Sequence, residues 1–197
     1  MANQNRPSGL TAVKHLTGAP FNGQGNIYYI APDDTNAYAV GDPVVSSGSG
    51  DDNGVPGITL AAATGAIRGV VLGLGTSESG IFNPNNLDST IRPSGAQAIG
   101  WYAIVADSPD IIFEVQEVGT GTSFTAAAIG SNANLSVGAN NGFQSGWQLA
   151  NTGSGTGATI QCRILGLSRR SDNTYGPYAK WLVKINVHEL SAGTVGV

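Results

Sequence analysis

The sequence predicts an all-β protein, an antiparallel β-barrel or jelly-roll-like sandwich with long loops and an extended N-terminal arm. Three observations predict this class. Apolar and polar residues alternate with a period of two in several segments, which is typical of antiparallel strands over one core. Glycine or proline interrupts every stretch that begins with helical spacing of apolar residues. Glycine accounts for 29 of the 197 residues, which suits turns between many short strands.

Residues 1–24 are expected to form the extended arm, and residues 25–197 to form a single β-rich domain. Four turn-forming residues punctuate the arm, namely Pro7, Gly9, Gly18 and Pro20. A segment of this kind becomes ordered only by lying on another surface. We therefore expect removal of residues 2–20 to leave the β-fold intact and to weaken attachment to a partner.

Eight segments of the domain have strand character, and they divide into two possible sub-sheets, 25–97 and 98–197. The first group is 26–31, 37–40, 42–47 and 66–74, and the second is 98–106, 110–118, 158–167 and 180–190. Three long polar segments, 48–57, 75–97 and 119–157, are predicted as loops, which at such lengths are usually functional or disordered. Two stretches, 59–67 and 123–132, can each hold one short helical turn.

The alternation in the last two strands predicts which side chains are buried. Cys162 lies on the same face as Ile160 and Ile164, so it is predicted to be a small buried apolar residue. In 180–190 the apolar face alternates with an outward polar face made of Lys180, Lys184, Asn186 and His188.

The charge content of the chain limits the classes of partner that it is expected to bind. Charged residues are only 11% of the chain, against about 25% in ordinary soluble domains, and this suits a protein that packs against neighbours. Secreted β-proteins share this feature. The net charge of −4 argues against a nucleic-acid partner, which needs a basic face. We expect no membrane partner, because no apolar run has the length of a membrane helix. The opening "MANQNRPSGLTAVKHL" lacks the apolar segment of a signal peptide, so synthesis in a cytoplasm is expected.

No metal and no cofactor are predicted. His15 and His188 are far apart in the sequence, and a lone cysteine cannot make a zinc site. Three oxygen-rich stretches, "PDDTN", "GDDNG" and "DSPD", could supply ligands for a calcium ion. Asp and Asn in such stretches more simply form turns, because their side chains hydrogen-bond to the nearby backbone.

No catalytic residue is predicted, and the protein is interpreted as a non-enzyme. A "GxSxG" motif is missing, and Glu114 and Glu117 fall on opposite faces of one strand, so they cannot act together on a substrate. An alternative is an enzyme such as a polysaccharide lyase, using Lys, Tyr and Arg side chains of the 169–184 region such as Arg170, Tyr178 and Lys180.

The loop "SRRSDNTYGPY" contains the densest group of charges. Arg169 and Arg170 stand close to Asp172, which predicts a local ion pair of small energetic value if it is exposed. The sharper alternative is that the two arginines contact a partner.

The opening "MANQNRPSGLTAVKHLTGAPFNGQGNIYYI" resembles the start of small virion structural proteins of tailed double-stranded-DNA bacteriophages. The similarity continues through "AYAVGDPVV", "IRGVVLGLG", "DSPDIIFEVQEVG" and "AKWLVKIN", and "GDPVV…GAIRGVVLG" is similar to β-rich head decoration proteins in general. These motifs are structural and have no chemical signature, and the loops 75–97 and 138–157 fall outside the similarity.

The resemblance implies a head decoration (cement) protein located on the outer surface of the capsid. Its implied partners are the major capsid protein and copies of itself at local two-fold or three-fold positions. The segment "NRPSGL" matches the capsid-contacting arm of the family. Candidate contact residues are Asn5, Arg6, Pro7 and Leu10 from this match, together with Arg169 and Arg170. The alternative is a β-sandwich that binds carbohydrate on a host surface through Trp101 or Trp147 and the Asn-rich loops.

Overall fold

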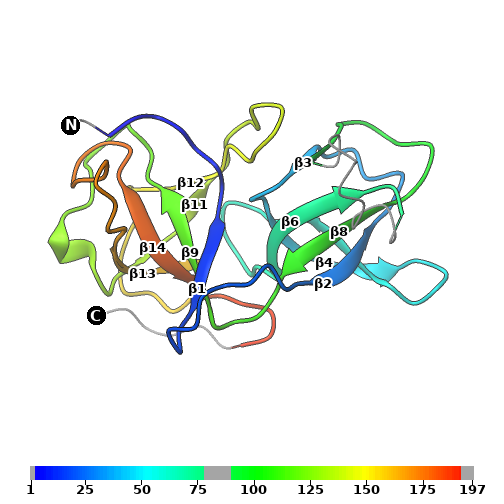
Figure 1. The fold of residues 1–197 in the computed structure, drawn as a ribbon, viewed down its shortest axis with the longest axis horizontal. Coiled ribbons are helices and arrows are strands. Elements are labelled where there is room, and N and C mark those ends of the chain that lie inside the picture. The colour runs from blue at the N-terminus through cyan, green and yellow to red at the C-terminus, as the bar shows by residue number, and fades with distance from the viewer. Residues whose placement is uncertain (1–2, 78–89, 192–197) are drawn as a thin grey trace.

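The computed structural model describes residues 3–77 and 90–191, and these residues form an all-β protein with two lobes (Figure 1). The predicted all-β class is confirmed. The strands of the first lobe are β2 (Asn26–Ile30), β3 (Tyr38–Ala39), β4 (Pro43–Gly50), β5 (Pro56–Leu60), β6 (Gly69–Gly75), β7 (Ile91–Arg92) and β8 (Trp101–Ala106). Those of the second are β1 (Thr11–His15), β9 (Ile111–Gln116), β10 (Asn132–Ala133), β11 (Leu135–Ser136), β12 (Gln148–Leu149), β13 (Cys162–Leu167) and β14 (Lys180–Ile185). One 3-10 turn, Ala126–Ala128, lies in the stretch 123–132, as expected.

The first lobe, residues 26–107, is called the ring lobe. Its hydrogen-bonded strands close on themselves in the order β2-β5-β4-β6-β8. All neighbours are antiparallel except β2 and β5, which meet in parallel at Tyr29 and Gly57. Tyr28, Ile30 and Leu74 belong to a core that lies inside this lobe. The prediction of one barrel or jelly roll for the whole domain is not confirmed, because the ring contains only this half of the chain.

The second lobe, residues 3–25 and 108–191, is called the sheet lobe. Its main sheet has the order β1-β9-β14-β13-β10, and every neighbouring pair is antiparallel. Side chains alternate along β14, so Trp181 and Val183 are fully buried while Lys180 and Lys184 remain partly exposed. Phe124 packs edge-on against Trp181 at a centroid distance of 5.8 Å.

The two lobes share one of their two cores. Ala61, Ile67 and Val70 come from the ring lobe but pack into the core of the sheet lobe. Ile67 also joins the lobes through its backbone, since its N–H donates to Val187 at 2.9 Å and its carbonyl accepts from Glu189 at 3.0 Å. The expected boundary between residues 97 and 98 is wrong, because β8 pairs with β2 and β6 inside the ring.

The N-terminal segment does not form an arm separate from the domain. Residues Thr11–His15 are an edge strand that pairs with β9, and Leu10 is 1% exposed in the shared core. Leu10 N–H donates to the carbonyl of Gly41 at 3.0 Å. This approach requires glycine, because a Cβ on Gly9 (φ +64) would lie 2.2 Å from that same carbonyl oxygen. Removal of residues 2–20 would take away this strand and Leu10, so the structure argues against an intact fold after that truncation.

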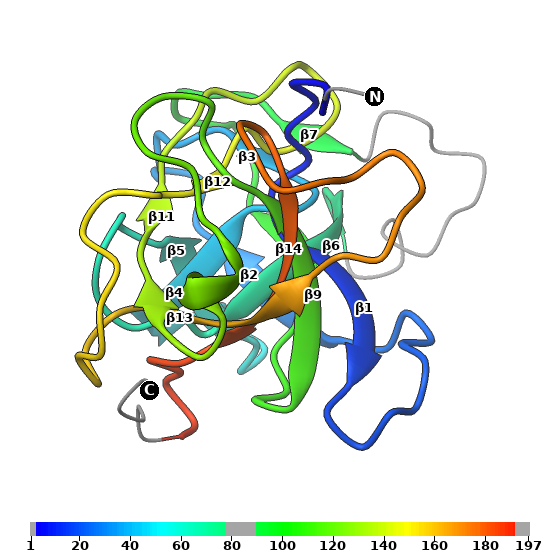
Figure 2. The same ribbon diagram turned by 90° about the vertical axis from the view of Figure 1, so that its left-hand side faces the viewer.

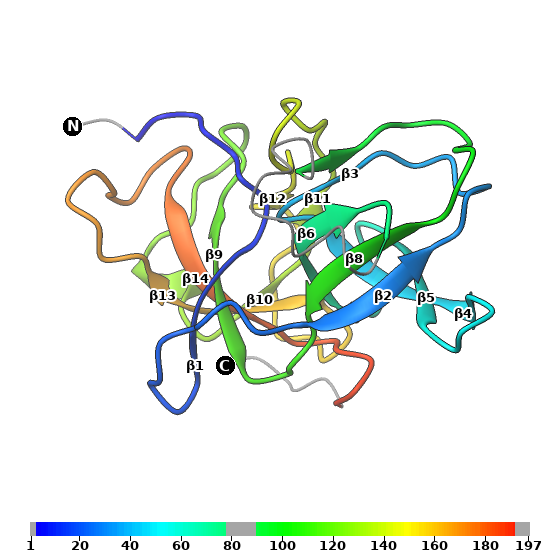
Figure 3. The same cartoon turned by 45° about the vertical axis from the view of Figure 1, so that its right-hand side comes forward.

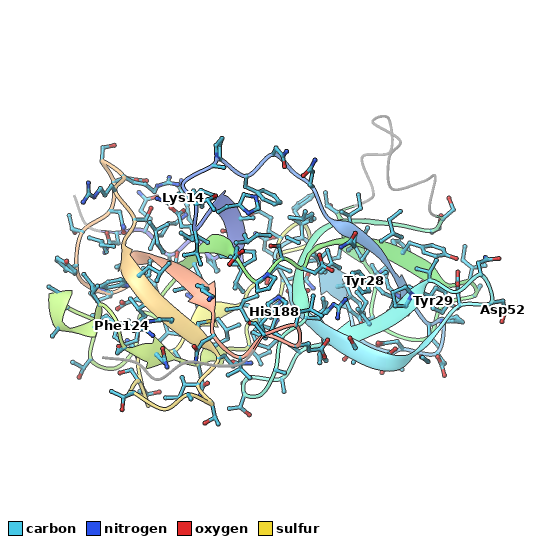
Figure 4. All side chains as sticks on the ribbon, turned by 90° about the horizontal axis from the view of Figure 1, so that it is seen from below. Lys14, Tyr28, Tyr29, Asp52, Phe124 and His188 are labelled. Carbon is cyan, nitrogen blue, oxygen red and sulfur yellow. The ribbon has the colours of Figure 1, made fainter. Side chains whose placement is uncertain are left out.

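The prediction for Cys162 is confirmed and the one for His188 is wrong. Cys162 is fully buried, and burial raises the pKa of its thiol to about 12. His188 is 3% exposed because β14 ends at Ile185, so the alternation does not continue past that residue. Asn186, also predicted to face outward, is buried too, and its amide donates to the carbonyls of Ala158 and Ile160. Figure 4 shows His188 where the two lobes meet.

Candidate docking surface

The outer face of the main sheet is basic. The strand register places Lys14 opposite Ile112, Ile112 opposite Lys184, and Lys184 opposite Arg163. Residues paired in this way point to the same side of a sheet, so Lys14 and Lys184 flank Ile112, and Arg163 lies beyond Lys184 on the same side. Figure 2, in which the sheet lobe faces the viewer, shows β1, β9 and β14 side by side. Within the described residues, no carboxylate lies within ion-pair distance of Lys14 or Lys184.

Two segments that are far apart in the sequence meet beside this face. Asn3 binds the loop before β14, because its amide nitrogen donates to the carbonyls of Thr174 (2.8 Å) and Pro177 (3.0 Å). Its amide oxygen accepts from the N–H of Thr174 at 3.0 Å. Gln116, which is 2% exposed, holds the next residues by donating to Asn5 (2.9 Å) and accepting from the backbone of Arg6 (2.8 Å). The first residues are therefore fixed on the sheet lobe.

A depression of about 280 Å³ lies between these segments. We call this surface the terminal patch and define it as Asn3, Gln4, Arg6, Arg170, Asp172, Asn173, Tyr178 and Lys180. The predicted ion pair is present, with Arg170 Nε 3.0 Å from Asp172 Oδ1, and it raises the pKa of Arg170 and lowers that of Asp172. Glu114 also accepts from Arg170 at 3.3 Å and lies 3.6 Å from Lys180 Nζ.

Tyr178 has the one positive φ of a residue other than glycine among the described residues, at 63°. Its ring lies against Gly119, where a Cβ would come within 2.0 Å of the ring. Such left-handed backbone costs about 1–3 kcal/mol and persists where the surroundings impose it. The strained residue is part of the terminal patch.

The six candidate contact residues divide into three groups. Asn5 and Arg6 are exposed, Pro7 is half-buried, and all three lie in the fixed N-terminal segment. Arg169 and Arg170 are exposed on the adjoining loop. The prediction that Leu10 contacts a partner is wrong, because its side chain is buried in the protein's own core. The alternation in 180–190 indicated Lys180 and Lys184, whereas no sequence pattern indicated that Lys14 lies across Ile112 from Lys184.

A groove of about 890 Å³ adjoins the terminal patch on the outer face of the sheet. We define the groove by the residues that line it, namely Val13, Lys14, Ile129, Leu165, Gly166, Leu167, Ser168, Arg169, Arg170, Asn173, Tyr175 and Leu182. Val13, Ile129 and Tyr175 are large apolar side chains exposed by 40%, 42% and 49%. The groove therefore combines apolar surface with a cationic rim.

The two lobes carry opposite charge. The ring lobe, in its described residues, has two cations, Arg68 and Arg92, and six carboxylates: Asp33, Asp34, Asp42, Asp51, Asp52 and Asp107. The other seven cations of the chain lie on the sheet lobe: Arg6, Lys14, Arg163, Arg169, Arg170, Lys180 and Lys184. Five carboxylates accompany them: Asp110, Glu114, Glu117, Asp172 and Glu189. The weak net charge of the chain thus conceals an acidic lobe and a basic lobe.

The oxygen-rich stretches form turns. Asp34 Oδ1 accepts from the backbone of Asn36 at 2.8 Å, and Asp51 Oδ1 accepts from Asn53 (2.9 Å) and Val55 (2.8 Å). Within residues 3–77 and 90–191, no cluster of three or more His, Cys, Asp or Glu residues could hold a metal ion. Among the same residues, no helix is long and apolar enough to span a membrane.

Comparisons with known proteins find no matching family model, no similar curated protein and no similar solved structure.

Proposed function

We propose that this protein is a non-enzymatic virion structural protein of the β-barrel or jelly-roll decoration type. It binds the outside of a tailed-phage capsid, contacts neighbouring major capsid subunits and stabilises the expanded head. One observation carries the proposal: the N-terminal segment and the Arg169–Arg170 loop, which sequence reasoning identified separately, lie together on one exposed surface. A surface built from two such segments is suited to docking.

The terminal patch is organised before any partner arrives. Asn3 and Gln116 fix Asn5 and Arg6 on the sheet lobe, so docking does not have to order a free arm. A pre-ordered surface loses less conformational entropy on binding, and more of the contact energy appears as affinity. A protein that binds the expanded shell better than the compact one stabilises the expanded state in proportion to that difference. Contacts with two neighbouring subunits add avidity.

The test is co-sedimentation of the purified protein with expanded, undecorated heads. Arg6→Glu reverses an exposed charge in the terminal patch, and we expect it to weaken binding at least about 10-fold, equivalent to about 1.4 kcal/mol. Thr64→Glu, at an exposed position on the ring lobe, is the control and should bind like the wild type. If the wild type fails to co-sediment at saturating concentration, the proposal is wrong.

Carbohydrate binding is the second candidate. Trp147 is 3% exposed, so it offers no stacking surface, whereas Trp101 is half-buried on β8. A glycan array in which Trp101→Ala abolishes a wild-type signal would favour this candidate over the capsid proposal.

A further inference from the structure

The groove next to the terminal patch has a chemistry that predicts its occupant. Leu165, Leu167 and Leu182 lie among its lining residues, and Val13, Ile129 and Tyr175 add exposed apolar surface. Lys14, Arg169 and Arg170 supply positive charge. A clustered apolar surface ringed by charge is typical of a protein contact, and its cations select an acidic partner.

An acidic projection of matching character lies on the other lobe. The hairpin between β4 and β5 extends away from the ring, as Figures 1 and 3 show, and Asp51 and Asp52 lie in its turn. Ile99, 56% exposed, lines the same depression as these two carboxylates. The hairpin therefore presents negative charge beside an apolar side chain, the complement of the groove.

The hairpin turn is held in shape. Asp51 accepts from the backbone of Asn53 and Val55 and, through its second oxygen, from the hydroxyl of Tyr102 at 2.8 Å. The neighbouring Asp52 is exposed. Because Asp51 fixes the turn, Asp52 is displayed without a large loss of conformational freedom on binding.

We propose that the groove binds the β4–β5 hairpin turn of a second copy of this chain, so that copies join head to tail. Figure 4 places Lys14 on the sheet lobe and Asp52 at the outer end of the ring lobe, so a hairpin cannot reach the groove of its own molecule. The two contacting surfaces are different, which makes the interface heterologous, and repetition gives a closed ring or an open chain. This inference goes beyond the proposed function, which requires only the terminal patch.

Purified protein without capsids tests the proposal, so its outcome is independent of shell binding. Sedimentation velocity should show reversible association at low salt that weakens at about 0.5 M salt, where exposed charges are screened. Asp52→Lys has an intact groove, and Lys14→Glu with Arg169→Glu has an intact hairpin. Each variant alone should associate at least about 10-fold more weakly than the wild type, a loss of about 1.4 kcal/mol. Mixed together they should associate more strongly than either variant alone, because the native groove of one receives the native hairpin of the other and the two reversed surfaces are also complementary in charge.

Asp33→Lys is the matched control, because it reverses an exposed charge on the ring lobe outside the hairpin. It should associate like the wild type. The proposal is overturned if the wild type is monomeric at every concentration, if Asp52→Lys associates as well as the wild type, or if the two variants mixed together associate no more strongly than either variant alone.

Discussion

Asp42 shows how burial at a single residue controls stability. The side chain is 3% exposed, and its Oδ2 accepts from the N–H of Ala39 at 2.8 Å. Burial raises the pKa of Asp42 from 3.8 to about 6, although hydrogen bonds from Ser145 and Ala39 oppose the shift. The folded protein therefore holds this proton more tightly than the unfolded chain does. Stability from this group is fully present below about pH 4 and is lost as pH rises through about 6.

Asp42→Asn should remove that pH dependence. In the wild type, this group should lower the free energy of unfolding by roughly 3 kcal/mol between about pH 4 and about pH 7, because each pKa unit is about 1.4 kcal/mol. Urea denaturation at a series of pH values measures the slope. Asp52→Asn, which removes an exposed carboxylate, is the control and should keep the wild-type slope. Parallel profiles for the wild type and Asp42→Asn would contradict the assignment.

For single residues, the alternation in the sequence predicted burial correctly inside regular strands and incorrectly beyond the ends of strands. Cys162 follows the alternation of β13, so its burial could be read directly. His188 lies three residues beyond β14, where the chain turns into the contact between the lobes. Its burial lowers the pKa of the imidazole and depends on Ile67 from the other lobe, a long-range contact that no local pattern contains.

Among the elements, β1 and β5 were the important omissions from the predicted strands. The segment before residue 24 was interpreted as an arm because glycine and proline surround it, and Pro56 and Gly57 made β5 look like part of a loop. Both strands are short and depend on partners, β9 for one and β2 and β4 for the other. The strands found by alternation, such as β9 and β14, supply their own apolar face. The groove is lined by β1, which the sequence did not reveal, and by β13 and β14, which it did, so only part of the groove could be predicted.

The N-terminal segment passes so close to Gly41 that a single methyl group added at Gly9 should destabilise the protein. Gly9→Ala should lower the free energy of unfolding by about 3 kcal/mol, since it combines a left-handed residue with overpacking against backbone. Gly23→Ala has a similar φ (+82), but its Cβ would meet nothing within 4 Å, so about 1–2 kcal/mol is expected. Chemical denaturation measures both. Equal losses would show that the close approach is unimportant.

Across the whole molecule, the shared core predicts that both lobes unfold together. Ile67 is fully buried and brings the ring lobe into the core of the sheet lobe. Ile67→Ala should cost about 2–5 kcal/mol, and hydrogen exchange in β8 and β14 should speed up by similar factors. Leu190→Ala, at a residue 53% exposed near the same junction, should change neither. Faster exchange in one lobe alone would show that the lobes are independent units.

The attachment of Asn3 to the 174–177 loop has a practical consequence for labelling. A purification tag or fluorescent protein fused ahead of this residue would emerge next to Arg6 and Arg170. Its bulk would cover Arg6 and Arg170, so a failed capture experiment with such a fusion would not test the proposed docking surface. A cleavable leader, or a dye placed on the ring lobe, keeps that corner of the molecule open.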